Sequence, residues 1–265
     1  MKGEDGAVLA DKVIAITGAS SGIGAEMARL FAERGATVLM MARSEVKLKQ
    51  LQQKIGGKTD WFVLDVTSSS MVDEAFTAAL ERYGRIDILV NNAGFGLFRP
   101  FLSLSEQEIE EMMDVNYFGM VRCTRAVLPQ MIERGSGHII NISSIAGKVG
   151  TAKTTAYAAT KHAVLGFTSA LRQELAGTGV HVSAFNPGPI RTPFFDRADP
   201  SGQYLRNLPG WFVLHPEKTA RAVVRLAETK KREMDIPFSL AIASKLYALF
   251  PGWSERVAGK WINRK

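Results

Sequence analysis

Short runs of apolar, mostly β-branched residues alternate with longer segments of helical period along nearly the whole chain. Each short run is apolar on both faces and is followed by Gly, Asn, Asp or Ser, which is typical of a buried strand. We expect such strands at 13–17, 37–41, 61–64, 86–90, 138–142 and 180–185. Apolar residues at three-to-four spacing predict helices at 24–34, 72–83, 106–134 and 156–176. Since such crossovers are right-handed, we expect a doubly wound α/β domain with about seven mostly parallel strands and helices on both faces.

The length of 265 residues fits one domain over 1–265, and no repeat or linker divides it. Region 193–214 is rich in aromatic residues, Pro and Gly, and should form a mobile lid over the crevice at the carboxyl ends of the strands. An amphipathic helix is expected at 238–250.

The formal charge of +7 is uneven, because residues 216–265 hold 11 Lys and Arg against 5 Asp and Glu. The nearly neutral remainder argues against nucleic-acid binding. The single Cys123 cannot form an intrachain disulfide, and no Cys or His has metal-ligand spacing, so we expect no metal site. The first residues lack the order of a signal peptide, and no window holds the roughly 18 uncharged apolar residues of a membrane span, so we expect a cytoplasmic protein.

Segment 17–24 reads TGASSGIG between a predicted strand and a predicted helix. The glycines bring backbone N–H groups toward a pyrophosphate, and the helix N-terminus favours its charge, so this context indicates a dinucleotide site. The second strand ends at Arg43 without the acidic residue that usually holds the ribose 2′-hydroxyl of NAD. The Arg43 guanidinium could meet the 2′-phosphate of NADP(H) or merely cap a strand end in solvent; NADP(H) is favoured over NAD(H).

Seven motifs in register over about residues 10–195 resemble those of the short-chain dehydrogenase/reductase family. They are the loop 17–24, LDV at 64–66, NNAG at 91–94, Asn116, Ser144, YAATK at 157–161 and NPGPIRT at 186–192. The resemblance implies a Rossmann fold and a bound dinucleotide, with the adenine at 65–66, the adenosine ribose beside 92–94 and the nicotinamide amide at 187–192. Taken singly, Asp65 could be a helix N-cap or part of a turn, 91–94 could be a turn, and Pro187-Gly188 could simply end a loop.

Cofactor-binding roles are expected for Gly18, Ser20, Ser21, Gly22, Ile23, Gly24, Arg43, Asp65, Val66, Asn92, Ala93, Gly94, Tyr157, Lys161, Pro187, Gly188, Ile190 and Thr192. Catalytic roles are expected for Asn116, Ser144, Tyr157 and Lys161.

Tyr157 and Lys161 are four residues apart in a predicted helix, so their side chains leave one face together. Hydride addition to a carbonyl builds charge on oxygen, and a phenol can donate the proton. We expect the Lys161 ammonium, a positively charged nicotinamide and a dry pocket jointly to lower the phenol pKa. In another context, Tyr157 would be a half-buried aromatic with Lys161 extended along it.

The resemblance adds that Lys161 binds the nicotinamide ribose, that Ser144 donates to the substrate oxygen, and that Asn116 holds a proton relay to Lys161 through a water. Ser143 and Ser144 are both candidates, and the offset of Ser144 from Tyr157 matches the family. Asn116 could otherwise be an ordinary polar residue of a long helix, where Asn is a poor helix former. The four histidines and Cys123 are interpreted as structural or surface residues.

Three segments should rim the substrate pocket: 95–102, 145–155 and 194–214. Their large side chains are apolar or aromatic, namely Phe95, Leu97, Phe98, Val149, Phe194, Phe195, Tyr204, Leu208, Trp211 and Phe212. Such a rim favours a lipophilic carbonyl or alcohol, although the same residues could simply pack the lid onto the domain.

The expected C-terminal helix is apolar over a wide stripe that includes Ile242, Leu246 and Leu249. The stripe could be covered by the protein's own core, by a second subunit, or by a membrane surface that attracts the basic residues Lys245, Arg256, Lys260, Arg264 and Lys265. A helix of this kind is similar to that of the hydroxysteroid dehydrogenase-like branch of the family.

The predicted helices 106–134 and 156–176 carry apolar residues on more than one stripe, which favours a homodimer or homotetramer that packs them together. Two functions fit these observations. The first is an NADP(H)-dependent oxidoreductase that transfers a hydride between the nicotinamide and a lipophilic carbonyl or alcohol, with Tyr157 as general acid/base. The second is a non-catalytic NADP(H)-binding structural or redox-sensing protein, which the joint presence of Tyr157 and Lys161 disfavours.

Overall fold

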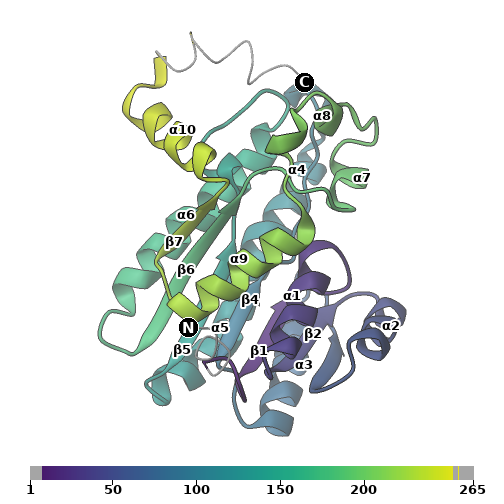
Figure 1. Cartoon of the computed structure of the whole chain (residues 1–265), viewed down its shortest axis with the longest axis vertical. Coiled ribbons are helices and arrows are strands. Elements are labelled where there is room, and N and C mark those ends of the chain that lie inside the picture. Colours follow the sequence, from purple (N-terminus) through teal and green to yellow (C-terminus); the bar gives the residue numbers. More distant parts are fainter. Residues whose placement is uncertain (1–7, 253–255, 257–265) are drawn as a thin grey trace.

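The strands form one parallel sheet in the order β3-β2-β1-β4-β5-β6-β7 in the computed structural model, which describes residues 8–252 and 256 (Figure 1). The strands are β1 Val13–Thr17, β2 Thr37–Ala42, β3 Thr59–Val63, β4 Ile88–Asn91, β5 Gly137–Ile142, β6 Val180–Pro187 and β7 Glu233–Ile236. Successive strands are added on one side of β1 up to β3 and on its other side from β4 onward. This reversal of strand order confirms the doubly wound fold and opens a crevice at the carboxyl ends of β1 and β4.

Helices cover both faces of the sheet (Figure 1). One face carries α1 Gly22–Glu33, α2 Glu45–Ile55 and α9 Pro216–Thr229. The other carries α3 Ser69–Tyr83, α5 Gly119–Glu133 and α6 Thr155–Glu174. Each strand in the middle of the sheet sends alternate side chains to the two cores: Ile14 packs beside Phe31 of α1, whereas Ala15 packs beside Phe76 of α3.

Three features differ from the sequence prediction. The segment predicted as a buried strand at 61–64 is the edge strand β3, and most of its residues are half-buried because no strand covers its outer side. The helix predicted at 106–134 is interrupted: α4 Glu106–Met113 and α5 are joined by a π-helical turn, Asp114–Phe118. The sequence pattern did not predict helices at α2 or α9, or a strand at β7.

The region 193–214 contains two short helices, α7 Phe194–Ala198 and α8 Gln203–Arg206, and the 3₁₀ turn Gly210–Phe212. Two further 3₁₀ turns are Phe101–Ser103 and Ile145–Gly147. The last described helix, α10 Phe238–Leu249, projects from the same end of the molecule as α7 and α8 (top of Figure 1). Among the described residues, none of the helices has the length and apolar character needed to cross a membrane.

Candidate active site

A cavity of about 1110 Å³ lies at the carboxyl ends of the strands, where the chain order reverses. Every residue expected to bind the cofactor lines it, from Gly18 after β1 to Thr192 after β6. Of the four expected catalytic residues, Ser144, Tyr157 and Lys161 line it too, and Asn116 lies beneath its wall.

The loop after β1 has the geometry that a pyrophosphate cradle needs. Gly18 has a φ of +66°, and a Cβ on Gly24 would lie 2.4 Å from the Gly18 carbonyl oxygen, so only glycine fits at these two positions. Helix α1 begins at Gly22, which lines the cavity, so the free backbone N–H groups of its first turn lie at the cavity. These residues therefore fit a dinucleotide phosphate group.

Asn92 and Thr17 fasten this loop to the end of β4. The Asn92 amide donates to the carbonyl oxygens of Thr17 and Gly18 at 2.9 and 3.2 Å. The Thr17 hydroxyl accepts from the backbone N–H groups of Asn92 and Ala93, both at 3.0 Å. The Asn92 side chain thus stabilises the conformation of the phosphate loop. The sequence motifs predicted only a contact with the ribose for this residue.

Two cations line the cavity near the end of β2, Arg43 and Lys47. Arg43 at the end of β2 lines the cavity and is exposed, as predicted for a contact to a 2′-phosphate. Lys47, in the first turn of α2, lines the same part of the cavity and was missed. The signal that could have found it is Ser44, which caps α2 by accepting from the Lys47 backbone N–H. A helix that begins there brings Lys47 to the side of Arg43.

Asp65 lines the cavity just after β3, and one oxygen of its carboxylate is hydrogen-bonded within the protein. Its Oδ1 accepts from the Thr67 backbone N–H at 3.0 Å and from the Thr67 hydroxyl at 2.8 Å. This turn fixes the carboxylate beside Val66, so the two candidate roles of Asp65, a turn former and an adenine acceptor, are compatible.

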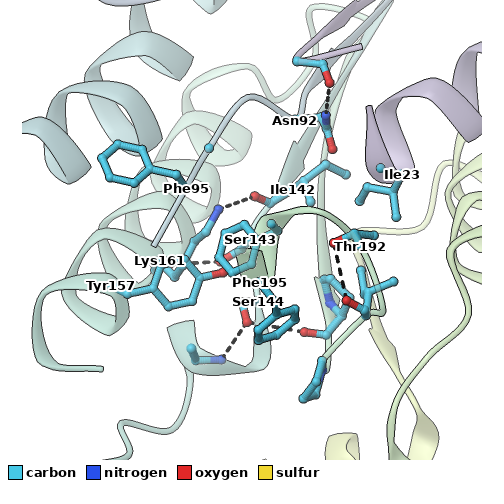
Figure 2. Close-up of a pocket in the computed structure, with 18 of the residues that line it drawn as sticks. Ile23, Asn92, Phe95, Ile142, Ser143, Ser144, Tyr157, Lys161, Thr192 and Phe195 are labelled. Atoms are coloured by element: carbon cyan, nitrogen blue, oxygen red, sulfur yellow. Dashed lines mark hydrogen bonds between the residues drawn. The ribbon is translucent and has the colours of Figure 1, made fainter. Parts of the chain in front are cut away.

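Tyr157, Lys161 and Ser144 meet in the deep part of the cavity (Figure 2). Helix α6 presents Tyr157 and Lys161 on one face, and both side chains are buried. Lys161 Nζ donates to the Ile142 carbonyl oxygen at 3.0 Å and lies 5.8 Å from the centre of the Tyr157 ring. Ser144 follows β5, and its hydroxyl accepts from the Ala146 N–H at 3.1 Å and donates to the Pro187 carbonyl at 3.4 Å.

The residues around Tyr157 by themselves raise the phenol pKa above its ordinary value. Burial raises the pKa of Tyr157 to about 12, and the hydrogen bond with Ser144 offsets only part of that effect. Burial also lowers the pKa of Lys161 to about 8. The Lys161 ammonium is turned to a backbone carbonyl rather than to the phenol oxygen, so the chain's own residues leave the proton firmly on Tyr157. The prediction of a lowered pKa had included the positive charge of a nicotinamide.

Asn116 sits in the π-helical turn and is almost fully buried. Its amide donates to the Phe95 carbonyl at 2.8 Å and to the Thr160 hydroxyl at 3.0 Å, and its oxygen accepts from the Phe95 N–H at 2.9 Å. The side chain therefore ties the loop after β4 to α6, one residue from Lys161. A π-turn is a costly irregularity that recurs at functional sites, and here it aims this amide inward.

The two adjacent serines have separate environments. Ser143 is buried and its hydroxyl donates to the Lys161 backbone carbonyl at 3.0 Å, whereas Ser144 faces Tyr157. Cys123 is a buried core residue, and burial raises the pKa of its thiol to about 12.

An ion-pair cluster below Ser144 was not predicted. Lys148, which follows the 3₁₀ turn after Ser144, lies 2.6 Å from Asp235 and 2.7 Å from Glu233, both on β7. Asn186 donates to the same two carboxylates at 2.7 and 2.6 Å. Burial opposes the charge of Lys148, but its hydrogen bonds to Asp235 and Glu233 raise its pKa. The cluster joins the Ser144 turn to the ends of β6 and β7.

The substrate side of the cavity is aromatic, as predicted. Phe98 stands at its centre and contacts the rings of Tyr157, Phe194, Phe195 and Tyr204 at centroid distances of 5.1–6.1 Å. These rings line the cavity and also pack the lid onto the domain, so both of the roles considered for them apply. Leu97 belongs to the core instead. Helix α10 adds an unpredicted wall, made by Leu240, Ala243, Ser244, Leu246 and Tyr247.

Comparison with known proteins identifies the family and the fold. The family model for short chain dehydrogenases matches residues 12–201. A dehydrogenase/reductase SDR family member 7B of Danio rerio is 40% identical over 191 residues, which cover 69% of this chain and 62% of that protein. The chain thus matches less than two thirds of the length of that relative.

Two solved structures are similar over most of the chain. A variant actinorhodin polyketide ketoreductase with NADPH has a TM-score of 0.78 and 32% identity, covering 85% of this chain and 95% of that one. A 3-ketoacyl-(acyl-carrier-protein) reductase from Brucella melitensis, complexed with NADH, has a TM-score of 0.80 and 31% identity, covering 86% and 97%. Together with the family match and the site geometry, these similarities show that the chain belongs to the short-chain dehydrogenase/reductase family of NAD(P)-dependent oxidoreductases.

Proposed function

We propose that this protein is an NADP(H)-dependent oxidoreductase that interconverts a lipophilic carbonyl compound and the corresponding alcohol. The observation that carries the proposal is the position of Tyr157: its phenol shares one cavity with Ser144, Lys161 and a glycine loop shaped for a pyrophosphate. The similar ketoreductases bind NADPH or NADH, so either nicotinamide is chemically compatible with this scaffold.

The nicotinamide would supply and accept the hydride, held by the loop 18–24, by Lys161 and by 187–192. The protein's own residues handle the proton. Ser144 donates a hydrogen bond to the carbonyl oxygen, which polarises it and stabilises charge that develops there. Tyr157 then donates its proton to that oxygen, because the alkoxide being formed is a stronger base than the phenolate. The positive charge of the nearby Lys161 ammonium stabilises the phenolate that remains.

Arg43 and Lys47 support the preference for NADP(H). Both line the cavity at the end of β2, where the position that commonly holds an acidic residue in NAD-specific sites is occupied by Arg43. A 2′-phosphate would gain charge-assisted hydrogen bonds from these groups, and a 2′-hydroxyl would not.

The aromatic lid supports the substrate class. Phe98, Phe194 and Phe195 face the region beside Tyr157. Apart from Lys161, Arg197 is the cation that lines this side of the cavity among the described residues. The Arg197 guanidinium lies 3.6 Å from the centre of the Phe95 ring and stacks on it. An apolar ketone or secondary alcohol would fit such walls better than a phosphorylated one. Kinship with the hydroxysteroid dehydrogenase-like branch stays a prediction.

The experiment is a panel of carbonyl and alcohol substrates of increasing apolar length, assayed with NADPH and NADH by nicotinamide absorbance. The proposal expects turnover that depends on the substrate and favours NADPH. Tight NADPH binding without turnover of any panel member would instead favour the second candidate, a non-catalytic NADP(H)-binding structural or sensing protein.

A further inference from the structure

Helix α10 is the most conspicuous apolar surface in the described residues. Five large apolar side chains on it or just after it are exposed, by 76% for Phe238, 70% for Leu249, 58% for Phe250, 47% for Ile242 and 43% for Leu246. The helix buries only Ala241 and Ser244, and it projects from the body of the molecule (Figure 1). A contiguous apolar surface of this size marks a contact with another molecule.

The helix and the sequence after it are mostly basic. Residues 238–265 hold five Lys and Arg and a single acidic residue, and no acidic residue occurs from 238 to 254. Lys245 on the helix and Arg256 after it are exposed. The segment therefore combines exposed apolar side chains with positive charge, and both apolar burial and attraction to anionic lipids strengthen binding to a membrane surface.

A second copy of the chain fits this surface poorly. Two α10 helices brought together would place two basic segments side by side, and like charges repel. A stable protein interface also buries about 800 Å² per partner from roughly 20–30 residues, which one 12-residue helix does not provide alone. An anionic lipid surface can bury the apolar side chains and also attract the positive charge.

We propose that α10 docks this protein on an anionic lipid surface, with Phe238, Ile242 and Leu249 at the boundary between headgroups and acyl chains. Other residues of the same helix, among them Leu240 and Tyr247, line the catalytic cavity. Lipid contact would thus bring the bilayer next to the substrate side of the site. This second step rests on the proposed function, and it points to amphiphilic substrates that reside in membranes.

The test is flotation of the full-length protein with vesicles of phosphatidylcholine alone and of phosphatidylcholine mixed with phosphatidylglycerol. We expect binding to the mixed vesicles, weaker binding to the neutral ones, and release at high salt. Leu249→Asp should weaken binding about 10-fold or more, since it removes a buried apolar contact with lipid. Val46→Asp is the matched control, because Val46 on α2 is exposed by 65% and should leave binding unchanged.

NADPH binding, measured in solution for each variant, shows that the variant is folded and keeps this test separate from the proposed catalytic function. Three results would overturn the proposal. They are failure of the wild type to bind mixed vesicles, equal binding by Leu249→Asp, and conversion of a lipid-free dimer into monomers by Leu249→Asp, which would assign the surface to a second copy.

Discussion

At the scale of a single side chain, we propose that Arg43 sets the preference for NADP(H) over NAD(H). Arg43→Ala should weaken NADPH binding by roughly 1.5–3 kcal/mol, the value of a charge-assisted hydrogen bond, and should change NADH binding little because NADH has no phosphate at this place. Fluorescence titration with both nucleotides measures the two effects. Equal losses for NADPH and NADH would show that Arg43 only supports the end of β2.

We expect Lys148 to act as a positioning residue, because its ion pairs with β7 hold the turn that follows Ser144. Lys148→Met breaks the ion pairs with Asp235 and Glu233 and should lower kcat by about 10-fold while NADPH binding is retained, because small misplacement of a catalytic donor is costly. Lys148→Arg should recover most of the activity. Lys218→Met, at an exposed position of α9, is the control. A loss of folded protein instead of kcat would contradict the positioning role.

Elements were predictable where apolar periodicity was strong. All six predicted runs form strands, and five of them are central strands with both faces buried, whereas the sixth is the edge strand β3. Helix α2 was missed because only Leu48 is buried among its mostly polar residues. Strand β7 was missed because two of its four residues, Glu233 and Asp235, are acidic. The π-turn around Asn116 leaves no periodic signal, since one inserted residue hardly changes the spacing of apolar positions. The seven family motifs indicated the site residues, but not the contacts of Lys47 or Lys148.

Asp87 joins three elements at the other end of the sheet. Its buried carboxylate accepts from the Val13 N–H at 2.9 Å and pairs with Arg85 and Arg134 at 3.1 and 2.6 Å. Asp87→Ala should lower the free energy of unfolding by about 2 kcal/mol, because it leaves a buried donor without its acceptor.

Urea denaturation of both proteins measures this difference. The exposed pair Glu45–Lys49 provides the comparison, and Glu45→Ala should cost less than about 0.5 kcal/mol. Similar losses for the two variants would contradict the role given to Asp87.

At the scale of the whole molecule, α4, α5 and α6 carry more apolar surface than one subunit covers. Val121, Leu128, Leu165 and Phe167 remain half-buried, and Phe118 is exposed by 47%. We propose that a second copy packs on these helices, giving at least a homodimer with a complete site in each subunit.

Sedimentation at micromolar concentration in moderate salt measures the assembly. We expect a dimer that persists when residues 238–265 are removed and that Phe118→Glu weakens, whereas Val46→Glu leaves it intact. A single species near 29 kDa for the wild type would contradict the proposal.

The central claim is that Tyr157 is the proton donor of a carbonyl reduction, and turnover by Tyr157→Phe tests it most directly. The substitution removes one hydroxyl and keeps the ring that packs against Phe98. We predict that kcat falls by about 10² to 10⁴-fold, the usual contribution of general acid–base catalysis, while the NADPH dissociation constant stays nearly unchanged. Retention of more than about a tenth of the wild-type kcat would contradict the assignment of Tyr157 as general acid/base.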